Sequence, residues 1–153
     1  MGEETGTSLE DVFRTEGPRM WRALVGYTAD PEIASDALAE AFAQALARGA
    51  QVRSPDRWIW RAAFRIAAGE LKRRSKVEAD PAERTEEMTE TVQDIVSALR
   101  RCSPNQRAAV VLHDYAGYRS AEVASILGMS APTVRVHLST GRRRLRHLLE
   151  DYR

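Results

Sequence analysis

The sequence predicts an all-α protein made of two small helical domains joined by a flexible linker. The 153 residues are rich in Ala, Leu, Arg and Glu, all of which favour helices. Apolar residues recur at helical spacing along most of the chain, but the acidic, polar stretch at 75–91 has no sustained apolar stripe. A helix–turn–helix pattern lies between Gly117 and Leu149. These observations place the domains at 8–74 and 92–150, with the linker at 75–91 between them.

The first domain is expected to begin with a helix near Leu9. Thr7 and Ser8 are candidate N-caps because a side-chain oxygen there can accept a hydrogen bond from an unpaired backbone N–H. Gly17-Pro18 interrupts the apolar pattern, and a proline inside a helix removes a backbone hydrogen bond. We therefore expect a break or kink at this point.

Two further helices complete the first domain. Asp30-Pro31 combines a capping residue with a proline at the first helical position, and this helix is expected to stop at Gly49. A third helix is expected from Pro55 to about Arg74, with a wide apolar face beside a cationic stripe. Such a helix can pack on a core while its stripe lies along phosphates, or the stripe can simply be solvated.

The second domain opens with a short helix whose apolar positions are Val92, Ile95, Val96 and Leu99. Ser103-Pro104 then marks the start of a helix with an N-cap and a proline in its first turn. The apolar side of this helix is expected to include Tyr115, and Gly117 is expected to end it.

The helix–turn–helix consists of a helix at 120–127, a turn at Gly128 and a second helix capped by Ser130. The second helix has an inward apolar stripe formed by Val134, Leu138, Leu145 and Leu148. Its other sides carry Thr133, Arg135, His137, Ser139, Thr140, Arg142, Arg143 and Arg144. A helix fixed by its apolar stripe, with a cationic outer face, fits the major groove of DNA. The alternative is a surface helix with a solvated basic face.

Charge is unevenly distributed along the chain, although the net charge is only +1. Most charged residues among the first forty are acidic, whereas residues 48–74 are mainly basic. Residues 80–90 are acidic again, and the C-terminus is basic. A near-neutral total built from blocks of opposite sign indicates two kinds of partner, one basic and one polyanionic.

The sequence contains no catalytic or metal-binding constellation. His113, His137 and His147 do not stand at metal-ligand spacing with carboxylates or thiols, and there is no glycine-rich phosphate loop or nucleophile elbow. Cys102 is the only cysteine, so it is expected to be a small buried side chain rather than part of a disulfide. We therefore expect no enzymatic activity, no cofactor and no metal.

Neither a signal peptide nor a membrane span is expected. The N-terminus is acidic and has no apolar core, and no apolar run is long enough to cross a bilayer. These features favour a cytoplasmic protein that does not insert into membranes.

With these elements in place, the chain resembles the extracytoplasmic-function (ECF) group of bacterial sigma factors, which retain sigma regions 2 and 4. SPNQRAAVVLHDYAGYRSAEVASILGMSAPTVRVHL closely follows the region 4 pattern of that family. DALAEAFAQAL resembles the signature of region 2.2, and SPDRWIWRAAFRIAAGELKRR resembles regions 2.3 and 2.4. Ala39, Arg65 and Gly69 depart from the region 2 pattern, where the family has Gln, Asn and Asp.

The resemblance implies a factor that binds core RNA polymerase and promoter DNA and directs transcription initiation. Region 2 would bind the β′ clamp helices through Asp36 and Glu40, and region 4 would bind the β flap. The residues implied at the −10 element are Gln51, Arg53, Arg57, Trp58, Arg61, Arg65, Lys72 and Arg73. Those implied at the −35 element are Arg119, Thr133, Arg135, Val136, Ser139, Thr140, Arg142 and Arg143. An anti-sigma factor is a further candidate partner.

Two other interpretations are open at this point. A sigma-like interaction protein could dock polymerase or an anti-sigma factor without melting the −10 element, which the departures in region 2 would permit. A LuxR-like regulator could bind DNA as a dimer, since TVRVHLSTG also resembles that family. The N-terminal half argues against the second alternative because it lacks the strand–helix alternation of a receiver domain.

Overall fold

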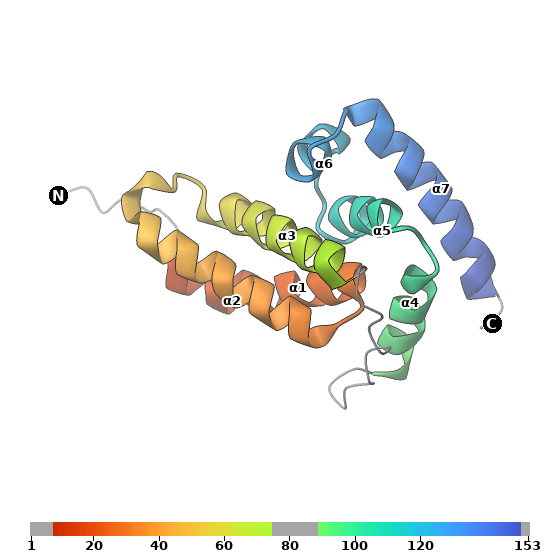
Figure 1. The fold of residues 1–153 in the computed structure, drawn as a ribbon, viewed down its shortest axis with the longest axis horizontal. Coiled ribbons are helices and arrows are strands. Elements are labelled where there is room, and N and C mark those ends of the chain that lie inside the picture. Colours follow the sequence, from red (N-terminus) through yellow and green to blue (C-terminus); the bar gives the residue numbers. More distant parts are fainter. Residues whose placement is uncertain (1–7, 75–88, 151–153) are drawn as a thin grey trace.

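The computed structural model describes residues 8–74 and 89–150 and shows only helices and turns within those ranges. This confirms the predicted all-α class. The N-terminal helices are α1 (Leu9–Thr28), α2 (Pro31–Arg48), a 3-10 turn at Gly49–Gln51 and α3 (Pro55–Arg74). The C-terminal helices are α4 (Glu90–Arg100), α5 (Pro104–Val110), a π-helical turn at Val111–Tyr115, α6 (Ser120–Leu127) and α7 (Ala131–Glu150). In Figure 1 the first group occupies the left of the molecule and the second group the right.

Helix α1 is continuous, so the break expected at Gly17-Pro18 is wrong. Ser8 caps the helix by accepting a hydrogen bond of 3.1 Å from the backbone N–H of Asp11. Val12 and Met20 lie on either side of the proline, and both are fully buried in the core. Burial on both sides opposes the loss of the one hydrogen bond that a proline removes, which keeps the two parts of the helix in line.

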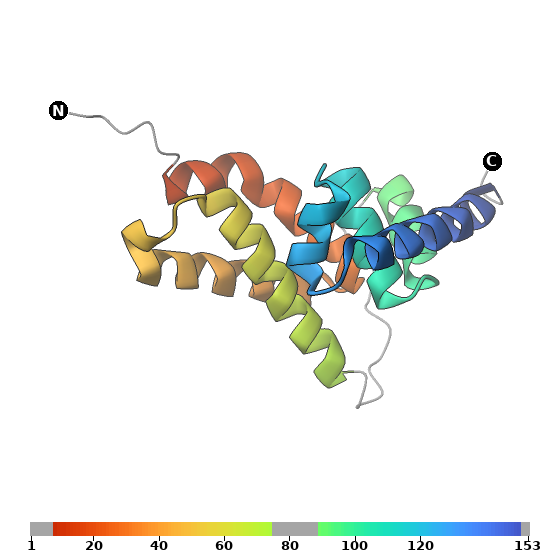
Figure 2. The same ribbon diagram turned by 90° about the horizontal axis from the view of Figure 1, so that it is seen from above.

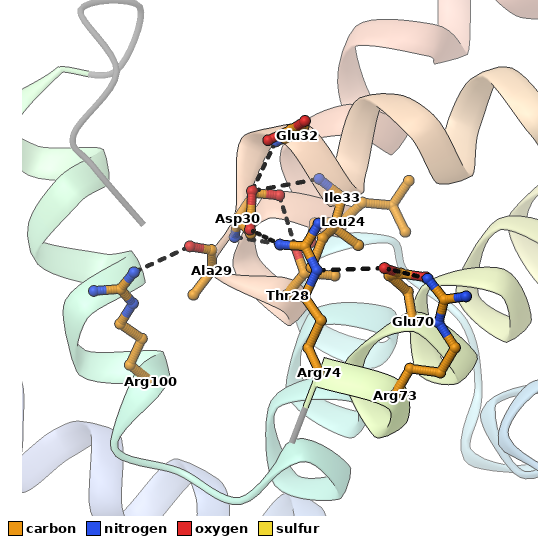
Figure 3. Close-up of polar contacts among 10 residues, drawn as sticks. All are labelled: Leu24, Thr28, Ala29, Asp30, Glu32, Ile33, Glu70, Arg73, Arg74 and Arg100. Carbon is orange, nitrogen blue, oxygen red and sulfur yellow. Dashed lines mark hydrogen bonds and ion pairs between the residues drawn. The ribbon is translucent and has the colours of Figure 1, made fainter. Parts of the chain in front are cut away.

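The turn from α1 to α2 confirms the start signal at Asp30-Pro31. Asp30 is the N-cap of α2, and its Oδ1 accepts hydrogen bonds from the backbone N–H groups of Glu32 and Ile33 at 2.9 and 3.4 Å. Ala29 precedes it in a left-handed conformation with φ of 58°. Figure 3 shows this turn with Arg74 and Arg100 converging on it from α3 and α4.

The N-terminal helices share a core centred on α3. Phe64 is 1% exposed, and its ring stacks on Tyr27 of α1 with 5.1 Å between ring centroids. The ring of Trp60 also stacks with Phe64, at 6.1 Å between centroids. Leu24 and Ile59 are fully buried beside them. The buried face therefore fixes the direction in which the arginines of α3 point.

The C-terminal helices follow the predicted caps but differ at the end of α5. Ser103 and Gln106 form a capping box at its start. The chain then passes through a π-helical turn before Gly117, rather than continuing as an α-helix. The extra residue per turn changes the register, so Tyr115 is exposed, although we expected it on the apolar side.

The helix–turn–helix forms as predicted. Gly128 adopts a left-handed conformation with φ of 68°, and Ser130 accepts a hydrogen bond of 3.2 Å from the backbone N–H of Thr133. Val134 and Leu138 of α7 are buried. Leu145 and Leu148, which we also placed on the inward stripe, are half-buried because the end of α7 is covered less completely.

The two groups of helices share one continuous hydrophobic core. A Cβ atom on Gly26 of α1 would lie 3.3 Å from Val111 and 3.4 Å from Leu99, so the absence of a side chain permits this close approach. Arg107 of α5 donates a 2.8 Å hydrogen bond to the carbonyl oxygen of Tyr27. Figures 1 and 2 both show α6 lying beside α3, far from it in sequence.

Candidate nucleic-acid interface

The outer face of α7 presents the side chains expected to read DNA. Val134 and Leu138 anchor the helix, and buried Gly141 lies against Val110 and Gln106 of α5. Of the residues that the resemblance placed at the −35 element, all are exposed: Arg119, Thr133, Arg135, Val136, Ser139, Thr140, Arg142 and Arg143. Val136 is 63% exposed, which is high for an aliphatic side chain in a folded domain. The face thus combines cations, hydroxyls and one apolar group.

Arg142 is held in place by the carboxylate of Asp114, which the sequence analysis did not single out. Its guanidinium forms two hydrogen bonds with Asp114 in the π-helical turn, one of them Nε to Oδ2 at 2.9 Å. This bidentate contact raises the pKa of Arg142 and ties α7 to the preceding turn. Asp114 is far from Arg142 in the sequence, and only the π-helical turn directs it toward α7.

The expected −10 residues lie on α3 and on the turn before it, and α6 covers part of them. Gln51, Arg53 and Arg65 are exposed. Arg57 forms an ion pair of 2.8 Å with Glu122 of α6. Arg61 donates to the hydroxyl of Ser125, also on α6, at 2.6 Å.

The two tryptophans of α3 have different surroundings. Trp60 is buried in the core, and its ring meets Tyr118 edge to face at 5.9 Å. Burial raises the pKa of Tyr118, so the phenol remains protonated. Trp58 is half-buried, and the guanidinium of Arg48 lies over its ring at 5.4 Å. Trp58, unlike Trp60, lines the cleft between α3 and α6.

The basic end of α3 is engaged in ion pairs. Arg73 pairs with Glu70 at 2.9 Å. Arg74 bridges Glu70 at 3.3 Å and Asp30 at 2.8 Å, which ties the end of α3 to the start of α2 (Figure 3). Lys72 is exposed. The cationic character of this end is partly neutralised within the protein.

The acidic face predicted on α2 is exposed to solvent. Asp36 and Glu40 lie one turn apart on the same side of the helix. Glu40 accepts a hydrogen bond of 3.0 Å from the amide of Gln44. Ala37 and Ala41 are buried beneath them, so the helix is fixed while the carboxylates remain available.

The described parts of the chain offer no group of three or more His, Cys, Asp or Glu side chains able to hold a metal ion. Cys102 is buried, as predicted, and burial raises the pKa of its thiol, which disfavours thiolate chemistry. Among residues 8–74 and 89–150, no helix is both long and apolar enough to cross a bilayer.

Comparisons with known proteins agree with this arrangement. The family model for sigma-70 region 4 matches residues 93–145. The RNA polymerase sigma-E factor of Streptomyces antibioticus is 33% identical, over 93% of this chain and 84% of that protein. The fold is similar to that of the sigma factor RpoE, solved with the anti-sigma factor NepR from Bartonella quintana, with a TM-score of 0.77 at 18% identity. That match covers 94% of this chain and 98% of the other.

A second solved structure has the same fold. CnrH, in complex with the cytosolic domain of CnrY, aligns with a TM-score of 0.68 at 18% identity, over 94% of this chain and 88% of CnrH. Together with the sequence relative, the region 4 match and the outward cationic face of α7, these findings identify the family. The chain belongs to the ECF group of the bacterial RNA polymerase sigma factors.

Proposed function

We propose that this sigma factor reads the −35 element with the outer face of α7 and the −10 element with α3 and the turn before it. The chain directs promoter-specific transcription initiation, as members of its family do. The observation that carries the residue-level proposal is the exposed polar and cationic face of α7, fixed by buried Val134, Leu138 and Gly141. Phosphate contacts of such a face position the protein, and side chains near the start of the helix reach the base edges.

The proposed division of labour follows the two groups of helices. Residues 8–74 would serve as region 2, binding core polymerase and the −10 element, and residues 92–150 would serve as region 4. The linker is proposed at 75–91, and its positions 75–88 lie outside the described residues. Helix α4 already begins at Glu90.

The proposed −10 surface consists of Gln51, Arg53, Arg57, Trp58, Arg61, Arg65, Lys72 and Arg73. Trp58 is half-buried, and an unstacked base would lie on its ring in place of the Arg48 guanidinium that now covers it. The arginines would follow the strand phosphates. The flipping of a base costs a few kcal/mol, and contacts in this surface would have to repay that cost.

Partners follow from the same assignment. Core RNA polymerase and promoter DNA are the partners of a sigma factor. We assign the β′ clamp helices to the exposed carboxylates Asp36 and Glu40, and the β flap to the C-terminal helices. An anti-sigma factor is a candidate third partner because both structural neighbours were solved with a protein bound. The family consists of non-enzymatic transcription regulators, and we assign the proposed activity of this chain to the cytoplasm.

Run-off transcription with core RNA polymerase on fragmented genomic DNA tests the proposal. Transcripts that start at defined promoters only when the protein is added would support it. Binding to core polymerase without initiation would instead favour the sigma-like interaction protein. A footprint of a dimer on a palindromic site, without affinity for core polymerase, would contradict the proposed function.

Arg135→Ala is expected to weaken binding of the holoenzyme to a promoter found in that assay by about 5- to 150-fold, equivalent to about 1–3 kcal/mol. Arg135 is exposed near the start of α7, where a recognition helix reaches bases. Gel-shift titration with wild-type and −35-scrambled promoters measures both affinity and specificity. Arg14→Ala, which removes an exposed cation from α1, is the matched control. Equal affinity of Arg135→Ala and wild type would show that this assignment is wrong.

Asp36→Lys combined with Glu40→Lys is expected to lower affinity for core polymerase about tenfold or more, because like charges across an interface cost several kcal/mol. Both side chains are exposed, so the fold should be unaffected. Surface plasmon resonance with immobilised core enzyme measures the change. The control Glu10→Lys with Asp11→Lys alters the net charge by the same amount at exposed sites on α1. If the two double variants bind core equally well, α2 does not carry the contact.

A further inference from the structure

Val136 is an aliphatic side chain on the outer face of α7, where most of the exposed residues are polar or cationic. Its exposed fraction is 63%, whereas Val134 and Leu138, two positions before and two after it, are buried. At about 100° per residue, two steps along a helix amount to a rotation of about 200°. Val136 therefore points away from the core, and the two residues that anchor α7 also fix the direction of this side chain.

The neighbours of Val136 on the surface of the helix have short side chains. Positions three and four residues away share a side of a helix. At these positions stand Pro132, Thr133, Ser139 and Thr140, all of them exposed. The hydroxyl of Thr133 is hydrogen-bonded to that of Ser130 at 2.7 Å, within the cap of α7. With short side chains on both sides, the methyl groups of Val136 can reach the floor of a groove that the helix enters.

An aliphatic side chain in the major groove has one favourable contact among the four bases. Guanine, adenine and cytosine present hydrogen-bond donors and acceptors there, and a side chain without polar atoms leaves these groups unpaired. Thymine also presents a methyl group, at C5, which an aliphatic side chain can cover. Burial of that methyl group against Val136 is favourable in proportion to the apolar area removed from water.

We propose that Val136 determines part of the −35 specificity by packing on the 5-methyl group of a thymine in that element. The inference rests on the proposed role of α7 and adds to it the base that this position selects. Val136 lies in the second turn of α7, next to Arg135, where a recognition helix reaches base edges. Phosphate contacts of the surrounding cations give affinity without sequence preference, and Val136 adds a preference for a T·A pair.

Replacement of thymine by uracil tests this contact, because deoxyuridine pairs as thymidine does but lacks the 5-methyl group. The holoenzyme is titrated by gel shift against a promoter found in the run-off assay, with each thymine of the −35 element replaced singly on either strand. With the wild-type chain, at least one of these duplexes is expected to bind about two- to fivefold more weakly, the effect of one lost apolar methyl contact. Uracil outside the −35 and −10 elements is the control in the DNA.

Val136→Ala provides the protein side of a double-mutant cycle. It is expected to weaken binding to the unmodified promoter about two- to fivefold, and the sensitive uracil should then cause no further loss. Because Val136 is exposed, its truncation should leave the thermal unfolding midpoint unchanged. Arg135→Ala is the matched variant on the same turn. It should weaken binding to every duplex, but the sensitive uracil should still cost the same factor.

Three results would each overturn the proposal. The first is a −35 element without thymine on either strand, since no methyl group would then be present for Val136 to contact. The second is equal affinity of the wild-type holoenzyme for all the uracil duplexes and the unmodified promoter. The third is the same loss on uracil replacement in the wild type and in Val136→Ala, because the methyl group would then act without Val136.

Failure of this inference is distinguishable from failure of the proposed function. If scrambling of the −35 element and Arg135→Ala both weaken binding while uracil replacement has no effect, α7 reads the −35 element without a contact from Val136 to thymine. If the scrambled −35 element binds as well as the native one, the proposed role of α7 is itself wrong.

Discussion

Phe64→Ala is expected to lower the free energy of unfolding by about 3–5 kcal/mol, the usual cost of removing a fully buried phenylalanine ring. Phe64 is 1% exposed, and its ring stacks with those of Tyr27 and Trp60. Its removal leaves a cavity at the point where α1 meets α3. Urea titration followed by far-ultraviolet circular dichroism measures the change.

The effect should extend from stability to function, because Phe64 fixes the face that α3 turns outward. We expect Phe64→Ala to weaken DNA binding through α3 more than DNA binding through α7. Phe13→Ala is the matched control: that ring is 60% exposed and meets only Phe42 in an edge-to-face contact at 5.2 Å among the ring pairs described. Its loss should cost at most about 1.5 kcal/mol. Equal destabilisation by the two variants would contradict the packing described for α3.

Gly141→Leu is expected to displace α7, the helix that we propose reads the −35 element. A Cβ atom at this position would lie 3.1 Å from Val110 Cγ2, 3.3 Å from Gln106 Cβ and 3.4 Å from the backbone oxygen of Gln106. The contacts with Val110 and with Gln106 Cβ are tighter than almost all real Cβ contacts, and a leucine adds three more carbon atoms beyond Cβ, so we expect α7 to move away from α5. Overpacking of this kind costs about 1–3 kcal/mol.

Displacement of α7 should also weaken −35 recognition by about tenfold or more, because base contacts depend on the angle at which the helix enters the groove. Thermal unfolding and promoter gel shifts measure the two effects together. Ala43→Leu is the control, since it adds a leucine at an exposed position of α2 outside both proposed DNA-binding surfaces. Wild-type −35 affinity in Gly141→Leu would show that α7 tolerates a shift and that the close crossing is not needed for reading DNA.

Local signals were sufficient for most helix boundaries. Asp30-Pro31, Ser103-Pro104 and Gly128 act through hydrogen bonds or dihedral angles within a few residues, so the sequence alone contains the relevant physics. The error at Pro18 has the opposite cause. A proline removes a local hydrogen bond, but burial of the residues around it is a tertiary effect that no local pattern reports.

The π-helical turn at Val111–Tyr115 illustrates the same limit within the candidate site. The sequence there continues as a plausible α-helix, yet one extra residue turns Tyr115 outward and directs Asp114 toward Arg142. Nothing in the spacing of apolar residues distinguishes the two registers. The pairing that steadies the recognition helix therefore could not be predicted from the sequence.

The sequence by itself determined the all-α class, the outward cationic face of α7 and the acidic face of α2, because each depends on helical periodicity and short-range caps. Only the tertiary structure decided that α6 covers part of the cationic stripe of α3. Glu122 and Ser125 meet Arg57 and Arg61 across more than sixty positions of the chain. A pattern read along the chain reveals which residues share a face of a helix, but the partner that covers that face is selected by packing between distant helices.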